Sequence, residues 1–576
     1  MEEGAFDVVI IGTGLTESIA AAALSKAGYK VAHLDENPYY GGREASLSLD
    51  ELVEWVDTKA SANDPHYSSV QRSQSTLSQS RQYSICLCPA VIPSIGPTIS
   101  SLVSSGVSKY GGFRLLERVG VYHPTGVVKN VPGTKEDVFK SKDMSLIDKR
   151  RLMRFLMFSI GDFENKKELE GNHHLPFADF LKTVFTLNDE VVTALIYSLA
   201  YCFSPSDPTG PALDRIRRYL RSAGRYGPSP FLVGHYGGTG DIAQGFCRAA
   251  AVSGAVYILG RNLTSIRYNN PQDLISVQHQ PGRYSITLQD FPDTLTCNVI
   301  ISSFTDIPLE LRGDINYLAP STSENLHSSS TVVRCIAIID RPIYFPPTEV
   351  IRGSINESEP FDETTRAPPP APQIIDAGVL VFPPSTIRGG STTMAATLLI
   401  TGEGTMSTPK GKWILYLALP LATILPVSGP MSAQEILQPY LNAALALTLP
   451  PDGPAPHVLD TESPPQLTPP QPLFTTFYIH HVDLGNRPHT PSHSHTTLEQ
   501  SKPGTFIIPS PLSPTCPLPD ISDNAATHAE TVFWEVTKLL NINEPPNAEN
   551  DARMNTEIGG FWPTLDTAND SGDEEW

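Results

Sequence analysis

A glycine-rich turn near the N-terminus constrains the fold most strongly. Residues 6–42 run FDVVIIGTGLTESIAAAALSKAGYKVAHLDENPYYGG. An apolar run, a turn with Gly12 and Gly14, an alanine-rich stretch and a second apolar run ending at Asp35 predict strand, turn, helix and strand. This order is typical of the first unit of a dinucleotide-binding domain, in which a helix N-terminus faces a pyrophosphate.

Glu17 departs from that pattern. It stands at the third position of G-x-G-x-x-G, where a glycine normally lets the helix lie close to the strand. A carboxylate in the first turn suits the helix dipole, but it takes the place of the diphosphate and would repel it. Asp35, twenty-one residues after Gly14, and Gly41-Gly42 otherwise complete the pattern of flavin-binding, amine oxidase-like proteins. We therefore expect a degenerate motif in an FAD-oxidoreductase-like α/β domain without a cofactor.

Composition sets the outer limits. The 576 residues are enough for two or more domains with sizeable cores. Forty-one basic and 61 acidic residues give a net charge of -20, which argues against a nucleic-acid surface because phosphate binding needs clustered Lys and Arg. The cysteines show neither a C-x-x-C pair nor metal-ligand spacing, so we expect reduced thiols and no metal site. They are Cys86, Cys88, Cys202, Cys247, Cys297, Cys335 and Cys516.

The sequence offers no membrane segment of its own. No basic region and cleavage site accompany the first apolar run, and the apolar stretch 413–425 is short and broken by Pro420. The end of the chain, SGDEEW, has no prenylation cysteine. We expect a cytoplasmic protein without a lipid anchor.

Low-complexity segments interrupt the chain. Proline accounts for 53 residues and is concentrated in 358–373, 449–473 and 508–520, while 61–81 is rich in Ser and Gln. Such segments bury too little apolar surface to offset the entropy of ordering them. We interpret them, with the acidic stretch 544–576, as loops or disordered insertions; an SH3-type ligand role for APPPAP is the alternative.

The middle of the chain changes to helical periodicity. Residues 85–108 predict a short strand followed by a helix, and 119–131 a hairpin turning near Pro124 to Gly126. Residues 146–160, 175–185, 188–201 and 211–223 then predict four helices, and strand and helix resume near 230. The predicted fold is therefore a large α/β domain with a smaller inserted all-helical domain. Its predicted divisions are 1–132 and 228–543 for the large domain, with insertions at 61–81, 345–373 and 449–473, 133–227 for the helical domain, and 544–576 for the tail.

Four sequence blocks carry a family resemblance. GTGLTES, NPYYGG, GRYGPSPFL and GTGDIAQGFCR resemble, in this order, conserved blocks of the Rab GDP-dissociation inhibitor and Rab escort protein superfamily. The resemblance implies a surface that binds the switch regions of a GDP-bound Rab GTPase, carried over to Tyr40, Asp241 and Arg248, with Ile258 as an apolar contact. Asp241 stands where the family usually has Glu. Its charge is kept, but its reach is shorter by one methylene.

Each of these residues also has a structural interpretation. Tyr40 is suited to packing a turn, Asp241 to capping the helix 242–252, and Arg248 to a solvated helix face. Since interface energy is concentrated in a few aromatic and Arg anchors, we expect Tyr40 and Arg248 to matter most for Rab binding.

The resemblance also places a geranylgeranyl lipid in the helical domain. Long hydrocarbon chains are costly to expose to water, at about 0.8 kcal/mol per CH₂. The candidate helices supply abundant apolar side chains, for which an ordinary bundle core is the alternative role. They are Phe155, Phe158, Phe177, Phe180, Phe185, Ile196, Leu199 and Tyr201.

The insertions favour the escort branch of the superfamily over the compact inhibitors. The resemblance then implies a non-catalytic component of Rab geranylgeranyltransferase, which presents Rab to the catalytic α/β dimer and carries the prenylated product to membranes in vesicular transport. The helix at 211–223 offers Arg215, Arg218, Tyr219 and Arg221 as an exposed face for that dimer, or simply as solvated charge. A GDP-dissociation inhibitor is the nearest alternative, and an FAD-dependent oxidoreductase a more distant one.

Overall fold

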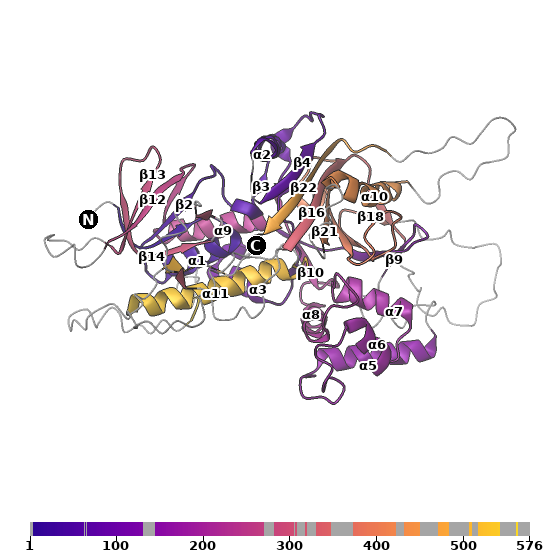
Figure 1. The fold of residues 1–576 in the computed structure, drawn as a ribbon. Helices are drawn as coiled ribbons and strands as arrows, with labels where there is room; N and C mark the ends of the chain where they lie inside the picture. Colours follow the sequence, from indigo (N-terminus) through magenta and orange to yellow (C-terminus); the bar gives the residue numbers. More distant parts are fainter. Residues whose placement is uncertain are drawn as a thin grey trace, which may run out of the picture.

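The computed structural model describes residues 4–62, 64, 66–130, 145–269, 282–303, 306–307, 317–318, 330–346, 373–421, 431–449, 470–482, 506–507, 509, 516–541 and 560–562. Within these ranges the chain forms a two-sheet body and a separate group of helices (Figure 1). Most of the predicted Pro-rich insertions 345–373 and 449–473, residues 508 and 510–515 of the segment 508–520, and residues 544–559 and 563–576 of the predicted tail lie outside the described residues.

The first sheet contains the glycine motif. Its order is β11-β2-β1-β14-β13-β12, with β15 and β23 pairing beyond β14. β1 lies between β2 and β14 in parallel register, and its residues Val8, Val9 and Ile10 are fully buried, as expected for a strand covered on both faces. The strands are β1 (Ala5–Ile11), β2 (Val31–Asp35), β11 (Val256–Leu259), β12 (Leu263–Tyr268), β13 (Tyr284–Leu288), β14 (Leu295–Ser302), β15 (Tyr317–Leu318) and β23 (Phe506–Ile507).

Helices cover one face of this sheet. α1 packs against α9 and α11 largely through alanine side chains, which let the helices approach closely; α3 lies beside α11 (Figure 1). The predicted strand–turn–helix–strand unit is therefore confirmed, and so is the return of strand and helix near residue 230. The helices are α1 (Leu15–Lys26), α3 (Pro97–Ser105), α9 (Thr239–Val252) and α11 (Asp520–Asn541).

The second sheet is mostly antiparallel, in the order β4-β22-β16-β21-β20-β19-β8-β9. α10 (Ala433–Ala446) buries its apolar side on one face, and α2 (Leu49–Ser61) packs against β4. The predicted hairpin appears as β8 and β9. The strands are β4 (Tyr67–Arg72), β8 (Arg118–Tyr122), β9 (Val128–Asn130), β16 (Ser330–Ile339), β19 (Ala377–Phe382), β20 (Ala396–Thr401), β21 (Trp413–Leu421) and β22 (Phe474–Val482).

Two predictions about low-complexity segments are wrong in part. Residues 67–72, within the predicted insertion 61–81, form β4, which pairs with β22 and thereby satisfies its backbone groups. Residues 560–562, within the predicted disordered tail, pack on the body: the Trp562 ring stacks on Phe246, 6.0 Å between centroids, and Phe561 meets Phe533. The burial of large aromatic rings explains why this short segment packs against the rest of the protein.

In the described residues, short strands form three smaller sheets. The predicted strand at the start of 85–108 is two separate strands, β5 and β6, and the following helix is α3. The strands are β3 (Ser46–Leu47), β5 (Ile85–Cys86), β6 (Ile92–Pro93), β7 (Phe113–Leu115), β10 (Phe231–Gly234), β17 (Ile343–Phe345) and β18 (Gln373–Ile375).

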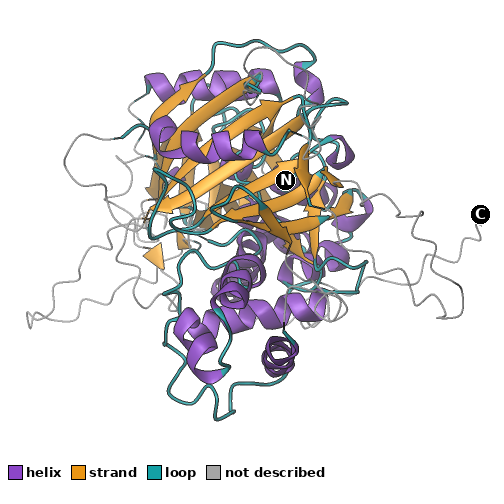
Figure 2. Cartoon of the chain, turned by 90° about the vertical axis from the view of Figure 1, so that its right-hand side faces the viewer, coloured by secondary structure: helices purple, strands orange, loops and turns teal. Residues whose placement is uncertain are grey.

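The four predicted helices form a group of their own, below the second sheet in both views (Figure 2). The fold class, a large α/β domain with a smaller inserted helical domain, is therefore confirmed. Aromatic rings fill the centre of the group, including Phe155, Phe177 and Phe180, each fully buried. The helices are α5 (Leu146–Ile160), α6 (Phe177–Val184), α7 (Asp189–Ala194), continued by a π-helical turn at Leu195–Leu199, and α8 (Thr209–Ser222).

Candidate functional site

The site predicted for partner binding is built on α9. The turn before this helix uses Gly237 and Gly238 with φ of 86° and 76°, a left-handed backbone that favours glycine. Because the opposite side of α9 is buried against α1, its outer side presents Asp241, Gln244 and Arg248, three and four residues apart, with Gln244 and Arg248 exposed.

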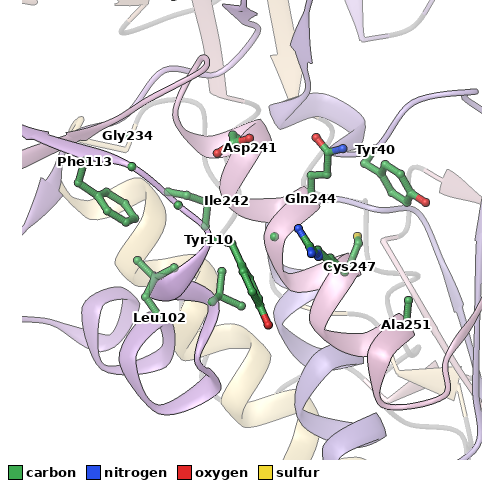
Figure 3. A pocket seen from close by; sticks show the side chains of 15 residues that line it. Tyr40, Leu102, Tyr110, Phe113, Gly234, Asp241, Ile242, Gln244, Cys247 and Ala251 are labelled. Carbon is green, nitrogen blue, oxygen red and sulfur yellow. The ribbon is translucent and has the colours of Figure 1, made fainter. Parts of the chain in front are cut away.

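A cavity of about 460 Å³ lies beside this stripe. Tyr40, Asp241 and Arg248, predicted from distant parts of the sequence, all line it. Figure 3 labels Tyr40 and Asp241 among the lining side chains. We call these three residues the α9 platform. The other walls come from α3 and the segment 107–113, and the remaining lining residues are Leu102, Val107, Tyr110, Gly111, Gly112, Phe113, Gly234, Ile242, Gln244, Gly245, Cys247 and Ala251.

Tyr110 contacts Arg248, the cation of the α9 platform. The guanidinium carbon of Arg248 lies 4.6 Å from the centre of the Tyr110 ring, a cation–π geometry. The ring is 54% exposed, so this pair faces solvent across the mouth of the cavity. Sequence reasoning missed Tyr110. The sequence signal is the glycine pair Gly111-Gly112 directly after Tyr110. This pair indicates close packing, because a side chain at Gly112 would collide with the His235 ring.

Asp241 is not the helix cap. The N-cap of α9 is Gly238, and Asp241 is the third residue of the helix, so the capping interpretation is wrong. Its position in the first turn suits the helix dipole. Burial raises the pKa of Asp241 to about 6, which still leaves the carboxylate charged at neutral pH.

Tyr40 reaches the platform from the turn after β2. Its half-buried ring packs edge-on against Tyr257, 5.6 Å between centroids. Ile258, in contrast, lies away from the cavity. Neighbouring residues of a strand point to opposite faces, and Ile258 packs on the far side of the sheet with the cluster that contains Val9 and Ile11. Ile258 therefore does not line this cavity, and its apolar contact with Rab stays a prediction.

The protein's own carboxyl groups fill the space beside the glycine motif. A side chain on Gly14 would meet Glu17 Oε2 at 2.6 Å and Glu44 Oε2 at 3.0 Å. Glu44 Oε2 also accepts a hydrogen bond of 3.2 Å from the Leu15 amide at the start of α1. Burial, with Asp306 and Glu44 nearby, raises the pKa of Glu17 to about 8. Acidic groups therefore fill the space where a diphosphate would approach the helix.

Asp35 is likewise engaged within the chain. Its carboxylate accepts hydrogen bonds from the Thr13 amide at 2.8 Å and from the amide and side chain of Asn37 at 2.8 and 2.9 Å. A ribose-binding acid needs a free carboxylate oxygen. The residues of the motif thus do not fit a dinucleotide, and we derive no chemistry from one.

The predicted face of α8 is mostly an interdomain contact. The expectation that Arg215, Arg218 and Tyr219 are exposed is wrong. Both arginines form ion pairs with Asp520 on α11 of the large domain, and Arg218 also pairs with Asp523. The Tyr219 hydroxyl donates a hydrogen bond to Asp520. Tyr219 is 1% exposed, since its ring is buried between the two domains.

Arg221 keeps an outward position. It donates to the Ile160 carbonyl at 3.0 Å, and its side chain is 48% exposed. Of the four predicted residues on α8, Arg221 therefore contributes most to the surface.

Comparison with known proteins decides the family. The family model described as GDI, GDP dissociation inhibitor, matches residues 1–350, more than half of the chain. The chain belongs to the GDP dissociation inhibitor family. It is similar to the Rab proteins geranylgeranyltransferase component A of Saccharomyces cerevisiae, 31% identical over 418 residues, which are 72% of this chain and 61% of that protein. It is also similar to the Rab GDP dissociation inhibitor beta of Rattus norvegicus, 31% identical over 272 residues, 46% of this chain and 58% of that one.

The fold agrees with this membership. The crystal structure of Rab GDI from Plasmodium falciparum superposes with a TM-score of 0.57 at 19% identity, covering 93% of this chain and 98% of the other. The alignments to the two curated relatives span 61% and 58% of their lengths. Among the described residues of this GDI-family chain, no helix is long and apolar enough to cross a membrane.

Proposed function

We propose that this GDI-family chain binds a GDP-bound Rab GTPase on the α9 platform. The observation that carries the proposal is the meeting of Tyr40, Asp241 and Arg248 around one cavity. An aromatic ring, an acid and an arginine at the rim of a hollow supply the anchor types that dominate protein interfaces. The carboxyl groups of Glu17 and Glu44, which fill the space beside the glycine motif, support a binding role over a flavin-dependent one.

The escort role follows from the relatives named as component A of the geranylgeranyltransferase. In this role the chain presents Rab to the catalytic α/β dimer without performing the transfer itself. It then holds the product and releases it at a membrane in vesicular transport, as a cytoplasmic protein that contacts membranes only during delivery. The GDP dissociation inhibitor beta among its relatives keeps inhibition as the second candidate.

The helical domain is the proposed place for the geranylgeranyl lipid. Its aromatic side chains pack on one another, as between Phe158 and Phe185 at 5.2 Å between centroids. A lipid therefore enters only when the helices move apart and exchange ring–ring contacts for lipid contacts. The π-helical turn at Leu195–Leu199 is a local irregularity of the kind often found at functional positions.

Docking of the prenyltransferase through α8 also remains a proposal. Arg215, Arg218 and Tyr219 are committed to α11, so Arg221 and its surroundings are the part of this face that is open to a partner.

Charge reversal at Arg248 tests the platform. Arg248→Glu should weaken binding of GDP-loaded Rab by about 30-fold or more, since interface arginines that act as hot spots contribute about 2 kcal/mol or more. Arg267→Glu is the matched control, because Arg267 is exposed at the far edge of the first sheet on β12. Equal affinity of the Arg248 variant and the wild type would refute the platform.

A further inference from the structure

Arg334 is a buried cation without a counter-charge in the described part of the chain. It lies near the middle of β16, and its side chain is 5% exposed. Its guanidinium Nη2 makes a weak contact with the Cys88 sulfur at 3.8 Å, and its Nε has no hydrogen-bond partner among the described residues. An isolated buried charge is strongly unfavourable, so native proteins normally pair it.

The side chains around Arg334 do not neutralise its positive charge. The side chains that act on it most are the thiols of Cys88 and Cys86 and the phenols of Tyr478 and Tyr67. Burial raises the pKa of Cys86 to about 12 and also raises those of the other three, so all four are neutral at neutral pH. The guanidinium therefore faces polar but uncharged neighbours.

A second unpartnered donor lies beside it. Tyr478 is the direct neighbour of Arg334 on β22, and His480 follows two residues later on the same face of the sheet. Such diagonal neighbours are about 7–8 Å apart. His480 is 8% exposed, its ring stacks on Tyr67 at 5.0 Å between centroids, and within the described ranges its Nε2 has no hydrogen-bond partner.

We propose that Arg334 and His480 together bind a small oxyanion on the inner face of the second sheet. The guanidinium would donate from Nε and an Nη to one or two oxygens, and His480 would donate from Nε2 to a third. Cys88 is partly exposed whereas Cys86 is buried, so the Cys88 side of the site offers a route from solvent. This ligand site is separate from the α9 platform and independent of Rab binding.

Inorganic phosphate is the probe for this site. Calorimetric titration into the full chain at constant ionic strength should give saturable one-to-one binding. Arg334→Met should abolish the binding, and His480→Phe, which keeps the stacking on Tyr67, should weaken it about tenfold or more. Arg341→Gln, an exposed arginine just beyond β16, should leave it unchanged.

Thermal unfolding supplies a second readout. In anion-free buffer Arg334→Met should unfold at the same or a higher temperature than the wild type, because an uncompensated charge is replaced by an apolar side chain of similar length. Phosphate should then raise the Tm of the wild type by a constant step for each tenfold increase in concentration above saturation, beyond the general salt effect measured on Arg334→Met.

Three results would overturn the proposal. One is no saturable phosphate binding to the wild type. Another is equal binding to the wild type and Arg334→Met, which would place the anion elsewhere. The third is a lower Tm of Arg334→Met in anion-free buffer, which would mean that the chain itself compensates the guanidinium.

Discussion

Asp523 joins the helical domain to the large domain, and its replacement gives a sharp prediction. Arg218 Nη1 on α8 lies 3.1 Å from Asp523 Oδ2 and 3.2 Å from Asp520 Oδ1 on α11. Tyr219 Oη donates to Asp520 at 3.2 Å, and Arg215 lies 3.7 Å from the same carboxylate. Two arginines thus face two aspartates, and Asp523 is 3% exposed.

Asp523→Asn removes one of the two negative charges and keeps the shape. The asparagine Oδ1 can still accept the hydrogen bond that the Thr98 amide donates to Asp523 at 3.1 Å. The loss is therefore the charge-assisted bond to Arg218, and such bonds contribute about 1.5–3 kcal/mol. We expect the free energy of opening the interdomain contact to fall by about 2 kcal/mol.

Native-state hydrogen exchange measures this directly, because it reports the opening free energy of α8 and α11 separately from that of the sheets. Asp189→Asn is the control: it removes the exposed Lys182–Asp189 pair of 2.7 Å in the same domain, where Asp189 is 88% exposed. Surface pairs of this kind contribute about 0–1 kcal/mol. If Asp523→Asn accelerates exchange in α8 no more than the control does, the interdomain reasoning is wrong.

Three further predictions concern other parts of the molecule. Burial raises the pKa of Glu17 from 4.5 to about 8, so between these two pH values the native state binds a proton that the unfolded state has lost. The free energy of unfolding should therefore fall as the pH rises from about 4.5 to about 8. Glu17→Gln should remove that slope, of up to about 1.4 kcal/mol per pH unit, in denaturant titrations; parallel pH curves for the two proteins would contradict it. Tyr110→Leu should weaken Rab binding by about two- to fivefold through loss of the cation–π contact with Arg248, and an unchanged calorimetric Kd would argue against it. Ser48→Ala should cost about 1 kcal/mol in thermal unfolding, because Ser48 and Glu51 form a capping box at α2; no change in Tm would count against that role.

Local patterns made much of the fold predictable. The glycine turn, the alanine-rich helix after it and the four helices with apolar periodicity all follow from short-range sequence. β4 was not predictable in this way, because its residues YSSVQR lack an apolar alternation and are held as a strand by pairing with β22, more than 400 residues away.

The site was predictable only through the family blocks. These blocks named Tyr40, Asp241 and Arg248, which the fold brings together. They gave no hint of Tyr110, which reaches Arg248 through the packing of α3 and the segment after it.

The wrong predictions arose where a residue contacts another that is far away in the sequence. Arg218 is 305 residues from Asp523, so its burial in an interdomain contact cannot be read from the pattern of α8, which resembles a solvated basic face. The packing of Trp562 on Phe246 has the same origin, since the tail by itself has the composition of a disordered segment.

Reconstituted prenylation tests the central proposal most directly. Purified Rab, geranylgeranyl diphosphate and the catalytic prenyltransferase dimer are combined with the wild-type chain, with Arg248→Glu or with neither. The escort role predicts lipid transfer that depends on the wild-type chain and is strongly reduced with the Arg248 variant. If the chain binds Rab and extracts it from membranes but prenylation does not increase, the escort role is contradicted and the chain acts as a GDP dissociation inhibitor.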